Sequence, residues 1–384
     1  MTMRIPKLLL IPFITMLQGA TMIDDVLAKG NTTSDLNQYV RSEVPGLQYI
    51  AVTADRVLFE YAGGWADIQG QKAMTLDTTL MAYSMTKTFT AVAILQLAER
   101  GKLNLDEVID RYLPNSPYHG HGITLRQLLD HTSGIPNPIP LRWVHLVEED
   151  SSFNETEALA AVLRENPDLA FEPGKKFTYS NIGYWLLGKV VEQVAGQSYP
   201  AYVRANILLP LGLAAQEMDF AIPDESRHAQ GYLAKYSLMN LVKGFVIDSK
   251  FLGNYEGNWL RLKSHYLNGP AFGGLIGTSR GFSRFLQDQL RTESALFGLE
   301  TKRLLGTQQT DGAGRPIQMT LGWHIGETDG AAYFFKEGGG GGFHSEMRIY
   351  PTKGIASIVL VNSTEFNSTK FLNRVDRAFL GPQQ

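Results

Sequence analysis

The most constraining feature of this chain is an almost wholly apolar helical stretch, residues 88–98, with a lysine immediately before it. A helix that is apolar on nearly every face is expected to be buried. Lys87 then lies in the first turn of a buried helix, where an unpaired ammonium group is costly, so it must be paired or neutral. The stretch therefore predicts both a core helix and a lysine in an unusual environment.

Ser84 lies three residues before Lys87, and residues at this spacing share a helix face with Cβ atoms about 5–6 Å apart. Burial disfavours a charged lysine, and a neutral amine can take the proton of a neighbouring serine hydroxyl. The N–H groups at the helix N-terminus favour the negative charge that develops in acyl transfer. Such a pair is also a common coincidence, but no other serine here has lysine at the third position. The pair therefore indicates a serine nucleophile with a lysine base.

The composition excludes several other chemistries. The 384 residues include no cysteine, which excludes disulfides, cysteine nucleophiles and thiolate metal sites. The eight histidines are scattered, without His-Glu-x-x-His spacing, so we expect no metal and no cofactor. A formal net charge of −3 does not favour nucleic acid, and we expect a small-molecule or peptide substrate with the oligomeric state left open.

The N-terminus resembles a secretory signal peptide. Arg4 and Lys7 precede an apolar run, residues 8–17, and residues 18–20 follow as an imperfect cleavage site. The run is too short to span a bilayer. We therefore expect residues 1–20 to direct export to the periplasm or the medium; an uncleaved anchor or a disordered leader is the alternative.

The apolar periodicity changes twice along the chain. Residues 47–64 predict a hairpin, and strands return near the C-terminus. The expected helices are 35–44, 124–129, 155–164, 182–194 and 368–380, and the expected C-terminal strands are 319–325, 331–336, 343–350 and 355–362. Strands at both ends predict an α/β (α+β) fold: one antiparallel sheet built from both termini and flanked by helices, with an all-helical insertion. We expect one domain over 25–384, with 25–83 and 270–384 as its α/β part and about 84–269 as its helical part.

Tyr179 and Asn181 lie two residues apart in a loop that enters an apolar helix. A phenol can accept and return a proton when a nearby cation lowers its pKa. An asparagine amide can bind both a lysine amine and a substrate carbonyl. The two residues are therefore candidates for the same cleft as Ser84, with a capping loop as the alternative.

Two other segments contain residues that could take part in catalysis or ligand binding. His131 and Ser133 invite comparison with a Ser–His pair, although the surrounding run is typical of a turn that the histidine stabilises. Residues 338–342 are all glycine and follow a predicted strand, so ligand backbone can approach closely and N–H groups are free for an oxyanion hole. A phosphate-binding loop is excluded because no Lys-Ser or Lys-Thr follows the glycines and no helix pattern begins there.

In this order, residues 84–87, 179–181 and 336–338 resemble the three motifs of the penicillin-recognising serine hydrolases, the β-lactamase-related family. The details resemble the branch that contains class C β-lactamases, D-alanyl-D-alanine carboxypeptidases and related esterases. Three further segments match that branch: residues 101–106, 128–136 and 273–278. The resemblance spans roughly residues 35–380 and implies a β-lactamase/transpeptidase-like fold with the active site where the helical and α/β parts meet.

The resemblance also implies catalytic roles. Ser84 would be the nucleophile that forms an acyl-enzyme, Lys87 would activate it, and Tyr179 would shuttle protons to the leaving group and from the deacylating water.

Substrate-binding roles follow from the same resemblance. Asn181 would orient the catalytic lysine and the substrate amide. Lys336 would keep the catalytic phenol acidic and contact a substrate carboxylate. Backbone N–H groups of Ser84 and Gly339, next to Gly338, would form the oxyanion hole.

Glu337 departs from the family pattern, which has threonine or serine between the lysine and glycine of the third motif. A glutamate that faced the cleft would repel a substrate carboxylate, and one that pointed away would only remove the hydroxyl. We therefore expect a serine hydrolase acting on an ester or amide, ranking D-amino-acid-like peptides or amides above carboxylic esters, and β-lactams third. A sensor or scaffold that acylates without turnover and an acyltransferase are the alternatives.

Residues 232–268 mix basic, aromatic and aliphatic side chains. They carry five lysines and arginines against two acidic residues. This composition predicts either a solvated helical insert or a lid that meets an acidic or apolar substrate or a membrane surface.

Overall fold

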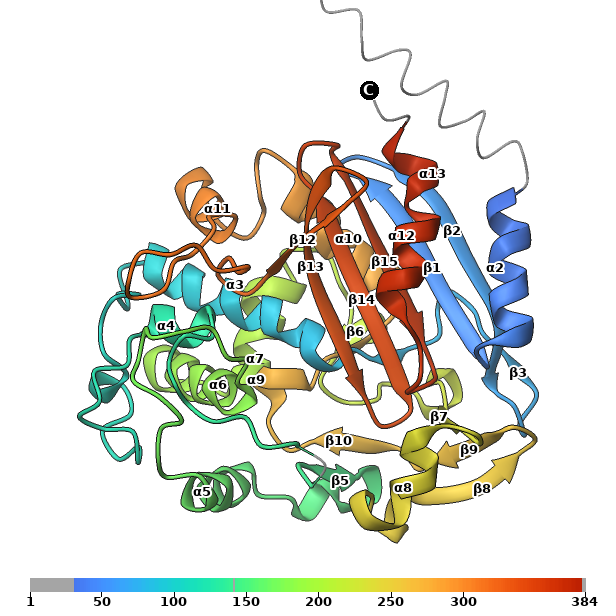
Figure 1. Ribbon diagram of the computed structural model, residues 1–384, viewed down its shortest axis with the longest axis horizontal. Coiled ribbons are helices and arrows are strands. Elements are labelled where there is room, and N and C mark those ends of the chain that lie inside the picture. Colours follow the sequence, from blue (N-terminus) through green and yellow to red (C-terminus); the bar gives the residue numbers. More distant parts are fainter. Residues whose placement is uncertain (1–30, 141, 382–384) are drawn as a thin grey trace, which may run out of the picture.

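The computed structural model describes residues 31–140 and 142–381. The predicted leader, residues 1–20, lies outside them. Figure 1 shows a broad sheet covered by helices on both faces, with a second, mainly helical region beside it. No helix in the described ranges is long and apolar enough to cross a membrane.

A seven-stranded sheet in the order β12-β13-β14-β15-β1-β2-β3 frames the molecule, and its neighbouring strands are antiparallel. Its strands are β1 (Gly46–Thr53), β2 (Val57–Asp67), β3 (Lys72–Ala73), β12 (His324–Thr328), β13 (Ala331–Gly340), β14 (Phe343–Tyr350) and β15 (Ile355–Val361). Strand β1 pairs with β15, so that Leu47 lies opposite Val361. The prediction of one antiparallel sheet built from both terminal parts is therefore confirmed.

Alternate residues of the central strands supply two separate cores, as the two-residue period of a strand requires. On β1, Leu47 and Tyr49 belong to a core shared with the helices near the chain ends, whereas Ile50 and Val52 belong to the main core. The helices of the first face are α2 (Asn31–Ser42), α12 (Ser368–Val375) and α13 (Arg377–Leu380). Helix α10 (Ser279–Leu290) packs on the second face, against β1 and β15.

The apolar stretch noted in the sequence forms helix α3 (Thr86–Glu99), and every residue of it up to Leu97 is buried. It packs mainly against α6 and α9. The other helices of this region are α4 (Leu125–Leu129), α5 (Glu155–Glu165), α6 (Asn181–Ala195), α7 (Tyr199–Val203), α8 (Leu238–Val246), α9 (Pro270–Gly273) and α11 (Leu299–Leu305). The prediction of a buried helix with Lys87 in its first turn is confirmed.

Two expectations about elements are wrong. The insertion is not all-helical, because it contains the strands β5 (Val144–Leu146), β6 (Met218–Asp219), β7 (Gly231–Ala234), β8 (Leu252–Glu256), β9 (Trp259–Leu262) and β10 (His265–Leu267). On β9, Leu260 and Leu262 are buried and alternate with more exposed residues, a two-residue period that is short enough to miss. The strand expected at 319–325 starts only at His324, because Gly322 turns the chain with φ +101°.

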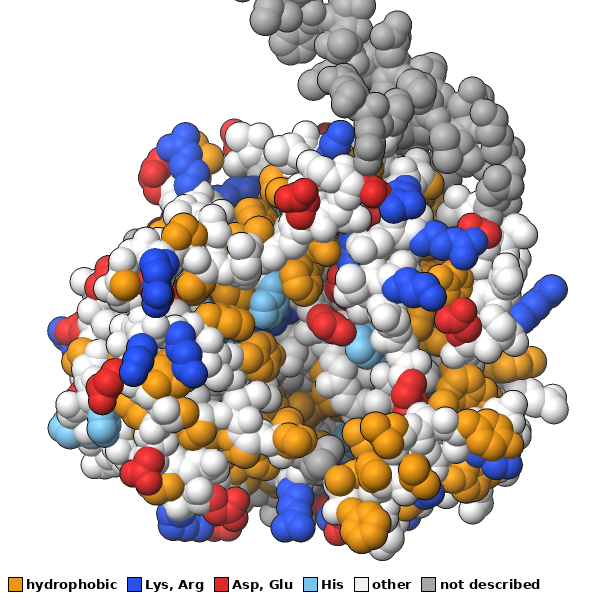
Figure 2. Space-filling model, viewed as in Figure 1, with side chains coloured by type: hydrophobic (Ala, Val, Ile, Leu, Met, Phe, Trp, Pro, Cys, Tyr) orange, Lys and Arg blue, Asp and Glu red, His pale blue; other side chains and the backbone are white. Residues whose placement is uncertain are grey.

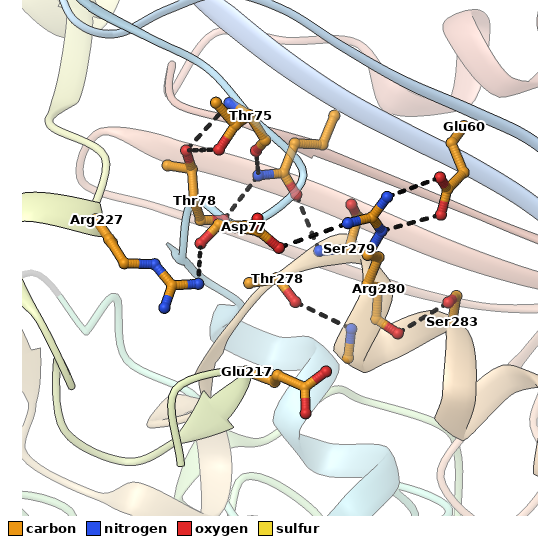
Figure 3. Close-up of polar contacts among 12 residues, drawn as sticks. Glu60, Thr75, Asp77, Thr78, Glu217, Arg227, Thr278, Ser279, Arg280 and Ser283 are labelled. Carbon is orange, nitrogen blue, oxygen red and sulfur yellow. Dashed lines mark hydrogen bonds and ion pairs between the residues drawn. The ribbon is translucent and has the colours of Figure 1, made fainter. Parts of the chain in front are cut away.

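Gln48 on β1 ties the chain that leads to Ser84 to the start of α10. Its side-chain oxygen accepts from Ser279 N at 2.9 Å, and its side-chain nitrogen donates to the carbonyls of Thr75 and Thr78, both at 2.7 Å. Figure 3 shows this junction, with the Thr75–Thr78 turn facing the first turn of α10. The turn continues into β4 (Leu80–Met81), which pairs with β11 (Ile276–Gly277) and ends just before the serine.

Candidate active site

Ser84 lies in a 3₁₀ turn, η1 (Tyr83–Met85), that joins β4 directly to α3. Tyr83 has φ +46°, a conformation that costs roughly 1–3 kcal/mol for a residue other than glycine. Its hydroxyl donates to the carbonyl of Gly341 at 2.9 Å and lies 3.0 Å from His265 Nε2. These contacts hold the strained turn that presents Ser84.

Lys87 is fully buried, and its amine lies close to three oxygens. Nζ is 3.0 Å from Ser84 Oγ, and it donates to Asn181 Oδ1 at 2.7 Å and to the carbonyl of Phe272 at 2.6 Å. Burial lowers the pKa of Lys87 well below its ordinary value, and the charge of Lys336 lowers it further. A neutral amine has two N–H bonds and one lone pair. Because the amide and carbonyl oxygens take the N–H bonds, the lone pair is left for the Ser84 hydroxyl.

Tyr179 approaches Ser84 from the other side and donates its hydroxyl to Ser84 Oγ at 2.8 Å. Burial raises the pKa of Tyr179, and the charge of Glu337 raises it further, whereas the hydrogen bond to Ser84 lowers it. The expectation that Lys336 keeps this phenol acidic is therefore wrong for this state of the protein. Removal from water, which disfavours the phenolate, is the largest cause of the shift.

Lys336 on β13 is also fully buried, and burial lowers its pKa to about 7. Its Nζ lies 5.2 Å from the centre of the Tyr179 ring and 3.5 Å from His324 Nε2. The amine thus lies beside two partly buried rings and has no exposed surface of its own. Its charge acts on Lys87.

Glu337 points away from the catalytic groups, which settles the orientation that the sequence left open. Its carboxylate lies 2.7 Å from His344 Nε2 on the next strand, β14. Successive residues of β13 alternate, so Lys336 and Gly338 are buried and Glu337 is exposed. Compared with the family pattern, the site therefore lacks the hydroxyl of a threonine or serine at position 337. The Glu337 carboxylate does not point into the cavity, so it does not repel a substrate carboxylate there.

Gly338 brings β13 against the nucleophile turn. A Cβ at this position would lie 2.1 Å from the Ala82 carbonyl oxygen and 3.0 Å from Ser84 N, so only glycine permits this approach. The next residue, Gly339, lines the same cavity as Ser84.

His131 serves the loop that carries Tyr179. Its Nδ1 accepts from Ser180 N at 3.1 Å, and its ring centre lies 4.4 Å from that of Tyr179. Ser133 Oγ instead accepts from Ile135 N at 3.3 Å. The Ser–His alternative is therefore wrong, and the interpretation of His131 as a loop-stabilising residue is confirmed.

Ser84 and Asn181 open into a cavity of about 270 Å³. Figure 2 shows the surface hollowed near the centre of this face. The apolar side chains that line it are Ile139, Pro140, Val144, Leu233, Met239, Ile247, Phe251, Leu262, Leu267 and Phe272. No aspartate, glutamate, lysine or arginine is among the described lining residues. Asn181 keeps its side-chain nitrogen free of any hydrogen bond within the described part of the chain, so this donor is available to a substrate carbonyl.

Sequence reasoning missed several contributors to this site. The Phe272 carbonyl that binds Lys87 is a backbone group and has no sequence signal. His324, which faces Lys336, and His265, which contacts Tyr83, look like isolated histidines in the sequence. The one signal in the sequence that could have pointed to a further contributor is the position of Tyr83 directly before Ser84. Among the described residues, no cluster of three or more histidine, aspartate or glutamate side chains could hold a metal ion.

The family model described as Beta-lactamase matches residues 24–380 of this chain. Penicillin-binding protein 4* of Bacillus subtilis (strain 168) is 30% identical over 164 residues, which cover 43% of this chain and 36% of that protein. Protein flp of Staphylococcus aureus (strain MRSA252) is 34% identical over 177 residues, covering 44% and 34%. The matched segment thus covers only about a third of the length of these curated relatives.

Solved structures show the same fold. The octameric penicillin-binding protein homologue of Pyrococcus abyssi superposes with a TM-score of 0.74 at 23% identity, covering 91% of this chain and 76% of that one. The D-amino acid amidase of Ochrobactrum anthropi, complexed with L-phenylalanine amide, has a TM-score of 0.71 at 20% identity, covering 94% and 98%. At these identities the likeness concerns the fold alone.

Proposed function

Because this chain belongs to the Beta-lactamase family, we propose that it is a serine hydrolase that cleaves an ester or amide through an acyl group on Ser84. The observation that carries the proposal is that the Ser84 hydroxyl contacts both an amine that can accept its proton and a phenol that can donate one. Ser84 Oγ lies 3.0 Å from the Lys87 amine and 2.8 Å from the Tyr179 hydroxyl.

In the proposed acylation step, Ser84 Oγ attacks the substrate carbonyl carbon and its proton passes to neutral Lys87. The N–H groups of Ser84 and Gly339 stabilise the negative oxygen of the tetrahedral intermediate. The bond to the leaving group then breaks, and Tyr179 gives that group its proton. The protonated lysine restores the proton of the phenol, so the serine proton has in effect moved to the leaving group.

In the proposed deacylation step, water attacks the acyl carbon and passes a proton to Lys87. The bond between the acyl carbon and Ser84 Oγ breaks, and the lysine returns the proton to the serine. With its pKa raised, Tyr179 is protonated at rest and is a weak acid, so its proton passes to the leaving group only as that group develops negative charge.

The cavity supports a neutral, apolar acyl group as the preferred substrate portion. Its described lining has no carboxylate to bind a free amine and no cation to bind a free carboxylate. An uncharged carboxylic ester therefore suits it better than a D-amino-acid amide with a free amine or a β-lactam with a free carboxylate, which reverses the order of esters and amides expected from the sequence. Asn181 can donate to a substrate carbonyl oxygen whether the substrate is an ester or an amide.

A small substrate panel tests the proposal: p-nitrophenyl esters of increasing chain length, D-alanyl p-nitroanilide and a chromogenic cephalosporin. We expect turnover of the esters and an acyl adduct at Ser84 in the mass spectrum of the quenched reaction. Ser84→Ala should abolish both. Turnover that survives in Ser84→Ala contradicts the proposal, and an adduct that forms without turnover supports an acyl sensor instead.

A further inference from the structure

Helix α8 and the turn that precedes it expose a row of large apolar side chains, which we call the α8 stripe: Tyr236, Leu238, Leu241 and Phe245. Their exposed fractions are 85%, 77%, 79% and 91%. The last three recur at helical spacing along one face. Figure 2 shows hydrophobic side chains gathered over α8, next to the central hollow. Contiguous exposed apolar side chains of this kind mark an interaction site.

The orientation of α8 is held by its other faces. Asn240 is buried; its side-chain nitrogen donates to the Ala234 carbonyl at 3.1 Å, and its oxygen accepts from Tyr255 Oη at 2.8 Å. Met239 and Ile247 line the active-site cavity. Thus α8 forms a wall of the cavity on one side and presents the α8 stripe to the outside on another.

The segment that contains the α8 stripe, residues 232–268, holds five lysines and arginines against two acidic residues, whereas the whole chain has a formal net charge of −3. Two of the five cations are paired: Lys250 with Glu149, and Arg261 with Asp67 and Glu256. Lys235 and Lys243 form no ion pair within the described residues, and their amines lie 5.7 and 5.9 Å from the centre of the Tyr255 ring. An apolar helix face flanked by lysines is typical of helices that lie in the surface of an anionic bilayer.

A second copy of this chain is a poorer occupant of the α8 stripe. Stable protein interfaces use about 20–30 residues on each side, and the stripe offers four large apolar ones. Two copies that met through the stripe would also bring the same unpaired lysines together.

We infer that the α8 stripe docks this protein on an anionic lipid surface, so that the active-site cavity next to α8 lies against the membrane. The inference goes beyond the proposed hydrolysis, because docking does not depend on the chemistry at Ser84. It adds that the esters reached by this cavity are those held in or near lipid.

The absence of cysteine allows a direct test with the full chain. Phe245→Cys carries an environment-sensitive fluorophore, and Leu299→Cys on α11, 49% exposed, is the matched control. With vesicles of phosphatidylcholine and phosphatidylglycerol, we expect a blue shift for the probe at 245 and none for the probe at 299. Vesicles of phosphatidylcholine alone, or added salt, should weaken the shift. No shift at 245 overturns the inference. A shift at 245 that follows protein concentration without vesicles also overturns it, in favour of self-association.

A second pair of variants measures the contribution of the stripe to binding. Leu241→Glu combined with Phe245→Glu should reduce co-sedimentation with the anionic vesicles at least about tenfold, because two apolar side chains no longer enter the lipid. Leu299→Glu should bind like the parent protein. Hydrolysis of a water-soluble ester should be unchanged in both, which separates a failure of docking from a failure of the proposed function. Equal binding of the double variant and the parent overturns the inference.

Discussion

At the scale of single residues, burial acts in opposite directions on the two groups that flank Ser84. It lowers the pKa of Lys87 and raises that of Tyr179, because in each case it favours the neutral form. A neutral amine accepts protons and a neutral phenol donates them. One physical cause therefore keeps both groups beside this hydroxyl neutral: the amine is free to accept a proton, and the phenol retains its own.

Lys336→Met should shift the acidic limb of the pH dependence of kcat/KM to higher pH. The charge of Lys336 lowers the pKa of Lys87, so its removal raises the pKa of the proposed base and leaves less neutral amine at pH 7. The measurement is ester hydrolysis from pH 5 to pH 9. Lys353→Met, at an exposed turn, is the control and should keep the parent profile. An unshifted limb in Lys336→Met contradicts the electrostatic role given to this residue.

Gly338→Ala should lower kcat/KM by at least about tenfold and destabilise the protein, because its Cβ would lie 2.1 Å from the Ala82 carbonyl. Gly339→Ala is the matched variant, since its Cβ would come no closer than 3.2 Å to the His344 ring. The second change retains the backbone N–H group and should have the smaller effect on both quantities. Ester kinetics and urea unfolding measure the difference, and equal effects would argue against close approach at position 338.

At the scale of elements, the loop before Ser84 depends on one buried side chain, that of Gln48. Gln48→Leu should lower the free energy of unfolding by at least about 2 kcal/mol, because the carbonyls of Thr75 and Thr78 and the N–H of Ser279 lose their partner. Glu60→Gln, which weakens an exposed ion pair with Arg280, should cost less than about 1 kcal/mol. Urea unfolding compares the two, and a similar cost for both would show that the junction in Figure 3 is not needed for stability.

The prediction of helices and strands from hydrophobic patterns succeeded for long segments and failed for short ones. Helix α3 is apolar on nearly every face, so its burial could be predicted from its composition. The strands β8 and β9 are five and four residues long, only β9 alternates between buried and more exposed residues, and both lie in a segment that also contains helix α8. Short alternating runs are ambiguous without the neighbouring strand that completes their hydrogen bonds.

At the scale of the whole molecule, the buried amine of Lys336 links stability to pH. Its pKa is about 7 in the folded protein, against an ordinary 10.5. Between these values the unfolded chain binds the additional proton, so the free energy of unfolding rises with pH in this window, by up to about 1.4 kcal/mol per pH unit.

Lys336→Met should remove this contribution. Between pH 7.5 and pH 9.5, the free energy of unfolding of the parent protein should rise relative to that of the variant. Urea unfolding followed by the fluorescence of the five tryptophans measures both. A constant difference between parent and variant over this range would show that the amine stays protonated in the folded protein.

The chemical types at the site and their order along the chain follow from the sequence. The spacing of Ser84 and Lys87, the Tyr179–Asn181 pair and the glycines from Gly338 onward are local patterns, and a local pattern can be read without a fold. The buried helix and the sheet built from both terminal parts follow from apolar periodicity in the same way.

Three properties emerge only in the folded chain: the direction of the pKa shift at Tyr179, the orientation of Glu337 and the apolar character of the cavity. These properties depend on which groups from distant segments surround a side chain and how much water they exclude. The Phe272 carbonyl and Lys336 lie 185 and 249 positions beyond Lys87, yet both act on its amine. Electrostatic and packing energies depend on distance through space, and chain folding alone sets that distance.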